Sequence, residues 1–304
     1  MDYSMTLDDN RTLSYAIYGD TRGHPVFYFH GGQESRLSAE FLHETALNLG
    51  IQLIAPDRPG VGQSSFQPNR QFTDYPDDIA ALAEYLDIDQ FSVFGLSGGS
   101  PHVLAVLQAM PERVHRASIV SGAIPYDVKG STKGMWFPVK MIHFLASRKN
   151  DKQLRKIMQD ERTTLFEKPE KKIRQFEKYL PKPDRELMTT QPEVAKGFIA
   201  GSQEAFAKNI DGVVQEWQLY VQPWGIDIAQ IQTPVTLWYG DKDKMAPLQR
   251  GFYLEATLPN ATLHELSNEA HFSLIHNHKH DILFDLLLPD TVKNSEQSIS
   301  AENP

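Results

Sequence analysis

The spacing of apolar residues alternates between two periods along the first 124 residues. Short apolar and β-branched runs are typical of buried strands, and apolar residues three or four positions apart are typical of helices. The predicted strands cover residues 13–18, 25–29, 51–55, 91–94 and 117–120, and the predicted helices cover 38–49, 77–86 and 98–110. This alternation indicates a parallel sheet with helices on both faces.

The pattern changes after residue 124. Strand signals almost disappear up to residue 231, and helical spacing prevails in the segments 140–146, 152–166, 169–180 and 203–220. The charge balance changes as well, because residues 125–231 hold 18 basic and 14 acidic side chains, whereas the whole chain has a net charge of −9. We interpret residues 125–231 as a helical insertion.

Strand and helix signals alternate again after residue 231. Strands are predicted at 235–239 and 261–266, and helices at 247–257 and in the segment that ends at Leu288. We therefore divide the chain into an α/β core of residues 1–124 and 232–290, the helical insertion, and a polar C-terminal tail of residues 291–304. The tail is not expected to fold, because it has too little apolar surface to bury.

Composition narrows the function. Hydrophobic residues make up 40% of the 304 positions, which is enough for a sizeable core. Cysteine is absent, which excludes disulfides, thiolate metal sites and a cysteine nucleophile. The net charge of −9 opposes binding to nucleic acid. The N-terminus shows no secretory signal, and no apolar run approaches the roughly 18 residues that span a bilayer, so we expect a cytoplasmic protein without membrane contact.

One short motif carries a candidate nucleophile. Residues 95–99 read Gly-Leu-Ser-Gly-Gly, follow the predicted strand 91–94 directly and open a predicted helix. A nucleophile elbow needs this arrangement, in which a tight turn holds the serine hydroxyl out at the carboxyl end of a strand and glycines avoid clashes. The helix N-terminus nearby favours developing negative charge. The motif is also a frequent chance match, so a structural turn serine is the alternative interpretation of Ser97.

A serine hydroxyl requires a base, and in this kind of site the chain order is serine, acid, histidine. Residues 240–243, Gly-Asp-Lys-Asp, follow the predicted strand 235–239 and offer Asp241 and Asp243 as the acid. The loop after the strand 261–266 presents His271. Three strands therefore each deliver one of the required groups in the required order, which is more specific than any single match.

With these motifs in this order, the chain resembles the α/β-hydrolase superfamily, in the branch of serine hydrolases that includes proline iminopeptidases and many esterase-like enzymes. The resemblance implies an α/β-hydrolase fold with the insertion at 125–231 in place of the family's cap. It also implies that Ser97 is the nucleophile, that His271 is the general base and then acid, and that Asp243 orients the histidine. Asp243 is favoured over Asp241 because the family's acid stands about four residues before a proline, here Pro247.

The resemblance extends to an oxyanion loop. Residues 30–32, His-Gly-Gly, follow the predicted strand 25–29, and the resemblance assigns the backbone N–H groups of Gly32 and Gly98 as donors to the developing oxyanion. The iminopeptidase pattern continues with Pro-Gly, whereas this chain has Gln33 and Glu34. This departure weakens the peptidase interpretation, and Gln33 is either a substrate contact or a solvated replacement.

Other residues give weaker evidence of a functional role. Trp136 and Trp217 either pack the insertion or line a substrate pocket beneath it. The histidines of residues 276–280 share a helix face, but no further ligands complete a metal shell by spacing, so no metal site is expected. Residues 57–64, Asp-Arg-Pro-Gly-Val-Gly-Gln-Ser, are interpreted as turns whose charged pair braces loops near the site.

These observations predict a serine hydrolase that cleaves a small carboxylic ester through an acyl-enzyme and needs no cofactor. A proline iminopeptidase-like aminopeptidase is the first alternative. A non-catalytic small-ligand receptor on the same fold is the second. The oligomeric state is left open.

Overall fold

The computed structural model describes residues 2–289, so the predicted tail at 291–304 lies outside the described residues. An eight-stranded sheet forms the centre of the molecule, in the order β1-β2-β4-β3-β5-β6-β7-β8. β1 (Asp2–Thr6) pairs antiparallel with β2 (Thr12–Gly19), and β2 pairs antiparallel with β4 (Ile51–Pro56). All later pairings are parallel, which confirms the predicted mostly parallel sheet.

All seven predicted strands are present, with ends that differ by three residues at most. The remaining five are β3 (His24–Phe29), β5 (Phe91–Leu96), β6 (Val114–Val120), β7 (Val235–Gly240) and β8 (Ala261–Leu266). β1 is a strand that the apolar pattern does not predict. Its residues are exposed except for the half-buried Met5, so it lacks the apolar alternation by which strands are recognised.

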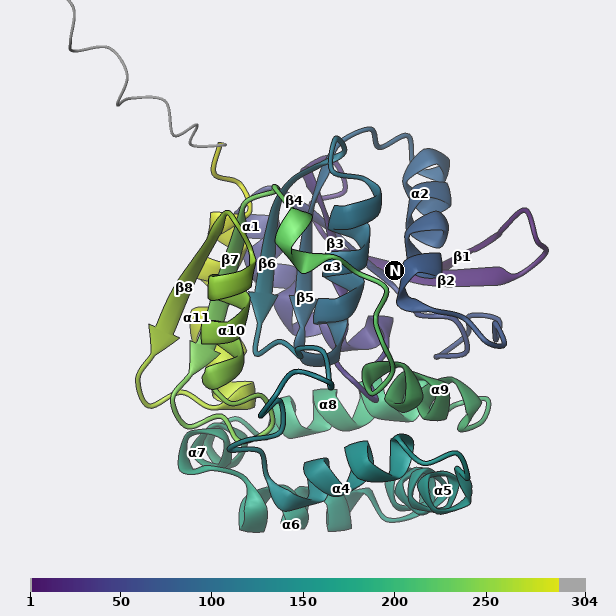
Figure 1. The fold of residues 1–304 in the computed structure, drawn as a ribbon, viewed down its shortest axis with the longest axis vertical. Coiled ribbons are helices and arrows are strands. Elements are labelled where there is room, and N and C mark those ends of the chain that lie inside the picture. Colours follow the sequence, from purple (N-terminus) through teal and green to yellow (C-terminus); the bar gives the residue numbers. More distant parts are fainter. Residues whose placement is uncertain (1, 290–304) are drawn as a thin grey trace, which may run out of the picture.

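Helices cover both faces of the sheet (Figure 1). α2 (Tyr75–Tyr85), α3 (Ser100–Ala109) and α10 (Gln249–Thr257) contribute to the apolar cluster on one face. α1 (His43–Asn48) and α11 (His271–Asp285) contribute to the cluster on the other. The predicted helix 38–49 begins as the 3₁₀ helix η1 (Arg36–Leu42), and the predicted helix 98–110 begins as the short 3₁₀ turn η3 (Ser97–Gly99).

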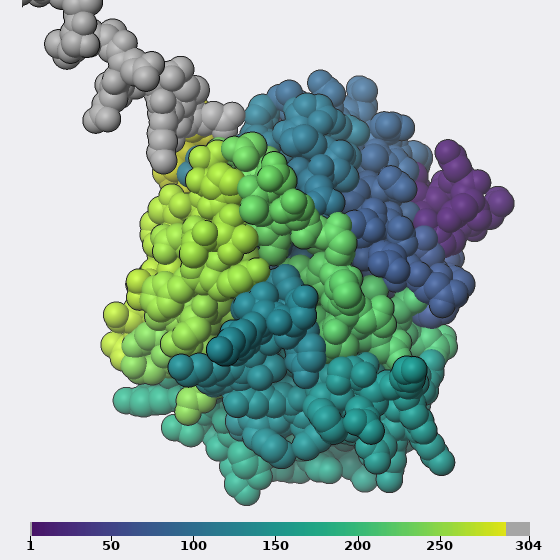
Figure 2. Space-filling model, viewed as in Figure 1, coloured from purple at the N-terminus to yellow at the C-terminus, as the bar shows by residue number. Residues whose placement is uncertain are grey.

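Six helices connect β6 to β7: α4 (Phe137–Ala146), α5 (Lys152–Glu167), α6 (Pro169–Tyr179), α7 (Lys182–Thr190), α8 (Pro192–Ala205) and α9 (Asp211–Tyr220). They lie together beyond the carboxyl ends of the parallel strands (Figure 1) and pack closely against the core in the space-filling view (Figure 2). We call α4–α9 the helical insertion. The carboxyl ends of the parallel strands therefore face this group of helices.

The predicted helix 203–220 is wrong, because the chain forms two helices there. α8 ends at Ala205, and α9 starts at Asp211, whose N–H donates to the side chain of Asn209 at 2.8 Å. An asparagine that accepts from the backbone two residues on is a common way to start a helix, so Asn209 carried a signal that the apolar spacing hid. α7 was also missed; it is short and lies between prolines.

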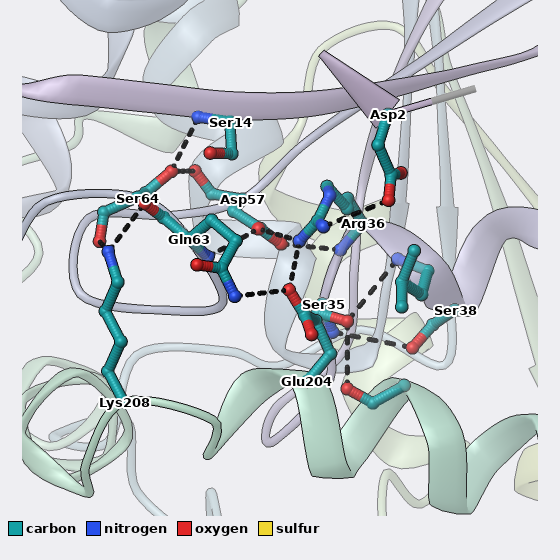
Figure 3. A network of polar contacts seen from close by, with 12 residues as sticks. Asp2, Ser14, Ser35, Arg36, Ser38, Asp57, Gln63, Ser64, Glu204 and Lys208 are labelled. Carbon is teal, nitrogen blue, oxygen red and sulfur yellow. Dashed lines mark hydrogen bonds and ion pairs between the residues drawn. The ribbon is translucent and has the colours of Figure 1, made fainter. Parts of the chain in front are cut away.

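Buried ion pairs fasten the helical insertion to the core (Figure 3). Arg36 donates to the carboxylate of Asp57 from its backbone N–H and from Nη1, both at 2.7 Å, and Nη1 also contacts Glu204 of α8 at 2.6 Å. The hydroxyl of Ser35 donates to the carbonyl of Gly201, also in α8, at 2.9 Å. The insertion is thus bound to the segment that directly follows the candidate oxyanion loop.

Candidate active site

Ser97 lies in a strained turn between β5 and α3. Its φ angle is +52°, in a region that residues with a side chain rarely adopt. A Cβ atom on Gly99 would lie 2.0 Å from the carbonyl oxygen of Phe29, and one on Gly95 would lie 2.5 Å from the side chain of Val103. The turn can therefore close this tightly only with glycine at both positions, and it holds Ser97 at the carboxyl end of a central strand.

His271 and Asp243 are joined by a buried hydrogen bond. The His271 Nδ1 lies 2.8 Å from Asp243 Oδ2, and the two residues are 7% and 4% exposed. The other oxygen, Oδ1, accepts the backbone N–H groups of Met245 and Ala246 at 2.7 and 2.8 Å. Because backbone bonds fix the carboxylate and the carboxylate fixes Nδ1, the Nε2 side of the imidazole is left for other partners.

The charges of this pair stabilise each other. Burial raises the pKa of Asp243, but the charge and hydrogen bond of His271 and the N–H of Ala246 outweigh it and lower the pKa below its ordinary value. Burial lowers the pKa of His271, but Asp243, with the carboxylates of Asp184 and Glu34, outweighs it and raises the pKa. Asp243 is therefore an ionised partner that favours the imidazolium form of His271.

Asp241, the alternative acid, contacts Asn268 and Lys242 instead of His271. Its Oδ1 accepts the backbone N–H of Asn268 at 2.8 Å, and its Oδ2 contacts Lys242 at 2.6 Å near the surface. It ties the loop after β7 to the loop after β8. The structure thus brings Asp243 to His271, and Asp241 to the loop that leads there.

Ser97 and His271 line a single cavity of about 680 Å³ between the core and the helical insertion. Gln33, Trp136 and Trp217 line it as well. Within residues 2–289, the hydrogen bonds of the His271 ring include Asp243 and do not include Ser97. The structure therefore brings Ser97, His271 and the proposed substrate contacts to one cavity, and Asp243 lies behind His271 without lining it. The serine and the histidine share no direct hydrogen bond in the described residues.

The two candidate oxyanion donors are neighbours. Gly32 and Gly98 both line the cavity, and a Cβ atom on Gly98 would lie 2.9 Å from the backbone nitrogen of Gly32. Ser100 Oγ donates to the carbonyl of Ser97 at 2.9 Å. In a trans peptide the carbonyl and the following N–H point in opposite directions, so this bond also fixes the direction of the Gly98 N–H.

Arg58 holds the other donor in the same way. Its Nη1 and Nη2 donate to the carbonyls of His30 and Gly31 at 2.6 and 2.8 Å. The Gly31 carbonyl and the Gly32 N–H belong to one planar peptide, so Arg58 orients that N–H. The charged pair of residues 57 and 58 therefore braces the loops of the site, as the sequence analysis predicts.

Gln33 departs from the iminopeptidase pattern in its backbone as well as its side chain. Its φ angle is +60°. Proline is fixed near −65° and could not adopt this conformation. The loop therefore follows a course here that the Pro-Gly version cannot share.

Three buried carboxylates around the site were missed by the sequence analysis. Glu216 of α9 contacts Arg58 at 2.9 Å and also Arg70, and it accepts from the hydroxyl of Tyr220 at 3.0 Å. Glu34 accepts the N–H of Gly31 at 3.1 Å and lines the cavity. The third, Asp184, belongs to α7. Glu216 and Tyr220 stand four residues apart on one helix face, which is the one local sign that the sequence offered.

The described part of the chain shows neither a candidate metal centre nor a candidate membrane span. Residues 2–289 contain no group of three or more histidine, aspartate or glutamate side chains arranged to hold a metal ion. None of the helices in this range is both long and apolar enough to cross a bilayer.

The chain belongs to the α/β-hydrolase fold family. The model of that family matches residues 24–277, which include every strand of the parallel part of the sheet and all the candidate site residues. The match spans most of the chain, in agreement with the resemblance drawn from its motifs.

Among individual relatives, the bifunctional esterase/perhydrolase DCH of Acinetobacter calcoaceticus is 24% identical over 252 residues, which are 81% of this chain and 83% of that protein. The uncharacterized hydrolase YcgS of Bacillus subtilis (strain 168) is 29% identical over 113 residues, 37% of this chain and 39% of that protein. A proline iminopeptidase of Xylella fastidiosa (strain 9a5c) is 32% identical over 116 residues, 36% of each chain. This chain thus matches less than half the length of the last two.

Solved structures share the fold. A probable hydrolytic enzyme from Pseudomonas aeruginosa PAO1 has a TM-score of 0.70 at 18% identity, with 95% of this chain and 94% of that chain covered. An esterase from Exiguobacterium antarcticum has a TM-score of 0.69 at 16% identity, with 94% and 98% covered. The coverage shows that the helical insertion, as well as the core, falls within the aligned length.

Proposed function

We propose that this protein is a serine hydrolase that cleaves a carboxylic ester through an acyl-enzyme. The observation that carries the proposal is that His271, which is bonded to Asp243 at 2.8 Å, lines the same cavity as Ser97. An esterase/perhydrolase that aligns with 81% of the chain adds support for this substrate class.

The proposed reaction begins when His271 takes the proton of Ser97 and the hydroxyl oxygen attacks the ester carbonyl. The N–H groups of Gly32 and Gly98 donate to the oxygen on which negative charge develops. Asp243 stabilises the imidazolium, which then protonates the leaving alcohol. Water, which gives a proton to the same histidine, attacks the acyl-enzyme. The bond between the acyl carbon and Ser97 Oγ breaks, the carboxylic acid leaves, and His271 passes the proton to Ser97.

Residues 125–231 act as a cap over this site. The cavity is lined from the insertion side by aromatic and aliphatic residues, among them Trp136, Phe176 and Trp217. An apolar wall excludes water from the acyl-enzyme and favours an apolar acyl group. Gln33 and the two tryptophans are the proposed substrate contacts, and the cap determines specificity.

One observation favours an aminopeptidase as the second candidate. Glu34 is a buried carboxylate on the cavity wall, and within residues 2–289 it has no ion-pair partner. A carboxylate in such a place can bind the free amine of a peptide substrate. The positive φ of Gln33, which proline cannot adopt, counts against an iminopeptidase-like loop.

Labelling with a fluorophosphonate, followed by peptide mapping, tests the proposal. An adduct on Ser97 in the wild type, absent in Ser97→Ala and His271→Ala, is expected. A folded wild type that stays unlabelled would indicate the non-catalytic receptor instead. Hydrolysis of p-nitrophenyl esters of increasing acyl length is then compared with that of prolyl anilides. A higher kcat/KM for the anilides would reverse the ranking of ester and peptide.

A further inference from the structure

A carboxylate of the helical insertion holds the start of the helix that carries His271. Asp184 of α7 is fully buried, and its Oδ1 accepts the backbone N–H groups of Phe272 and Ser273 at 2.9 and 2.8 Å. These residues directly follow His271 in the first turn of α11. The first N–H groups of a helix have no partner within it, so Asp184 supplies acceptors that the helix lacks.

The charge of Asp184 also acts on the imidazole. Three carboxylates face His271 from different parts of the chain: Asp243 after β7, Glu34 after β3 and Asp184 on α7. Asp243 touches the ring, and the other two act at longer range. Because little water screens charges in this buried site, a second and a third carboxylate still favour a positive charge on the ring.

The second oxygen of Asp184 takes no part in holding the helix. Oδ2 is buried and has no hydrogen-bond partner in the described part of the chain. A purely structural acceptor could be supplied by a neutral side chain without the cost of a buried charge. The retained charge has a use if a positive charge forms beside it, as it does on His271 during acyl transfer.

We propose that Asp184 is a positioning residue of the catalytic base, which fixes His271 through the first turn of α11 and stabilises the imidazolium by its charge. The inference rests on the proposed function. It makes the insertion part of the catalytic machinery of the core, because one of its helices sets the orientation and the basicity of a residue that lies outside it.

Asp184 carries its negative charge only above a certain pH. Burial raises the pKa of Asp184 to about 6, although the N–H groups of Ser273 and Phe272 and the charge of His271 oppose this. Below that pH the carboxyl becomes neutral, and the imidazole loses one of its three negative neighbours. The groups that face Asp184 are His271 and Asp243, so its titration is coupled to theirs.

Asp184→Asn separates the charge from the hydrogen bonds, because the amide oxygen can still accept from Phe272 and Ser273. The midpoint of the acidic limb of the kcat/KM profile reports protonation of the free enzyme's base. In Asp184→Asn we expect it to move to lower pH by about 0.5–1 unit, since one carboxylate no longer favours the imidazolium. A midpoint equal to that of the wild type overturns the proposal.

Glu186→Gln is the matched control. Glu186 lies on the same helix but is exposed and pairs with Lys182, so its variant removes one negative charge without touching the site. It should leave the acidic limb unchanged. Asp184→Ala removes both charge and acceptor, and should lower the melting temperature as well as shift the profile. Asp184→Asn should keep a melting temperature close to that of the wild type but still shift the kcat/KM profile. A merely structural role of Asp184 predicts no such shift.

Titration of the His271 ring protons by NMR in the wild type gives a test that needs no variant of Asp184. Two steps are expected, one from His271 itself and one near pH 6 from Asp184. A single step contradicts the proposal. If the wild type is active and His271→Ala is not, but the acidic limb of the kcat/KM profile is the same in Asp184→Asn as in the wild type, this inference is refuted and the proposed function stands. An inactive and unlabelled wild type would refute the proposed function.

Discussion

Arg58 and Gly31 are joined by a hydrogen bond of 2.8 Å, and this bond sets the direction of the N–H group of the next residue, Gly32. A second bond, to the carbonyl of His30, gives the guanidinium a two-point hold on the loop. Glu216 holds the guanidinium in turn. Arg58, which does not line the cavity, therefore orients one of the two proposed donors to the oxyanion.

Arg58→Lys should lower kcat by about 10²-fold with little change in KM, because lysine cannot reproduce the fork that holds two carbonyls and a misdirected donor is lost chiefly in the transition state. Steady-state kinetics with a p-nitrophenyl ester, with circular dichroism to verify folding, measures this. Arg113→Lys is the control, since Arg113 also donates to two carbonyls, those of Asp89 and Ile88, at the opposite edge of the sheet. A similar loss in both variants would contradict a role at the loop.

Asp243→Asn should reduce kcat about 10⁴-fold, because an amide holds the imidazole in the wrong tautomer and does not stabilise its charge. Asp241→Asn should change kcat by less than about 3-fold, since Asp241 supports only the loop. The two variants compare the same substitution two residues apart. If Asp241→Asn is the more damaging, the acid has been assigned to the wrong residue.

Gly99→Ala should destabilise the protein by about 3 kcal/mol, because the new methyl group would lie 2.0 Å from the Phe29 carbonyl and the backbone has to move. Gly197→Ala should stabilise it by about 0.5–1 kcal/mol, since Gly197 lies within α8 with open space around it. Urea unfolding of both variants measures the difference. Equal stabilities would mean that the elbow is not packed as described.

The buried His143 should lower the free energy of unfolding at acidic pH. Burial lowers its pKa to about 4, below the value of about 6.5 that it has when unfolded. The folded state therefore favours the neutral ring. Its contribution to the free energy of unfolding is complete above about pH 6.5. As the pH falls from there towards 4, the free energy of unfolding decreases by about 1.4 kcal/mol per pH unit. In His143→Phe the loss of unfolding free energy between pH 7 and pH 4.5 should be smaller by about 2–3 kcal/mol. Parallel curves for the two proteins would contradict this.

The parts of the fold that could be predicted are those with a strong local signal. Buried parallel strands such as β5 are mostly apolar, and the proposed triad residues follow three predicted strands in a recognisable order. β1 could not be predicted because its five residues lack the alternation of apolar and polar positions that marks a strand. The break between α8 and α9 was hidden because apolar spacing continues across it.

The residues that support the site could not be recognised from the local sequence pattern. Asp184 bonds to residues 88 and 89 positions further along the chain, and nothing in the segment around it distinguishes it from the exposed acidic residues nearby. Glu216 reaches Arg58 and Arg70 in the same way, from a helix of the insertion to loops of the core. Burial of a charge is decided by such distant partners, so only the folded arrangement reveals it.

The anchoring of the insertion limits how substrate preference can be re-engineered. Asp184, Glu204 and Glu216 each reach from a different helix to a different loop of the core. A chimera that replaced residues 125–231 with the corresponding segment of another hydrolase would remove the carboxylates of Glu204, Glu216 and Asp184 from Arg36, Arg58 and the start of α11. Exchange of whole segments would therefore damage turnover together with selectivity, whereas substitutions confined to the aromatic wall would leave these anchors intact.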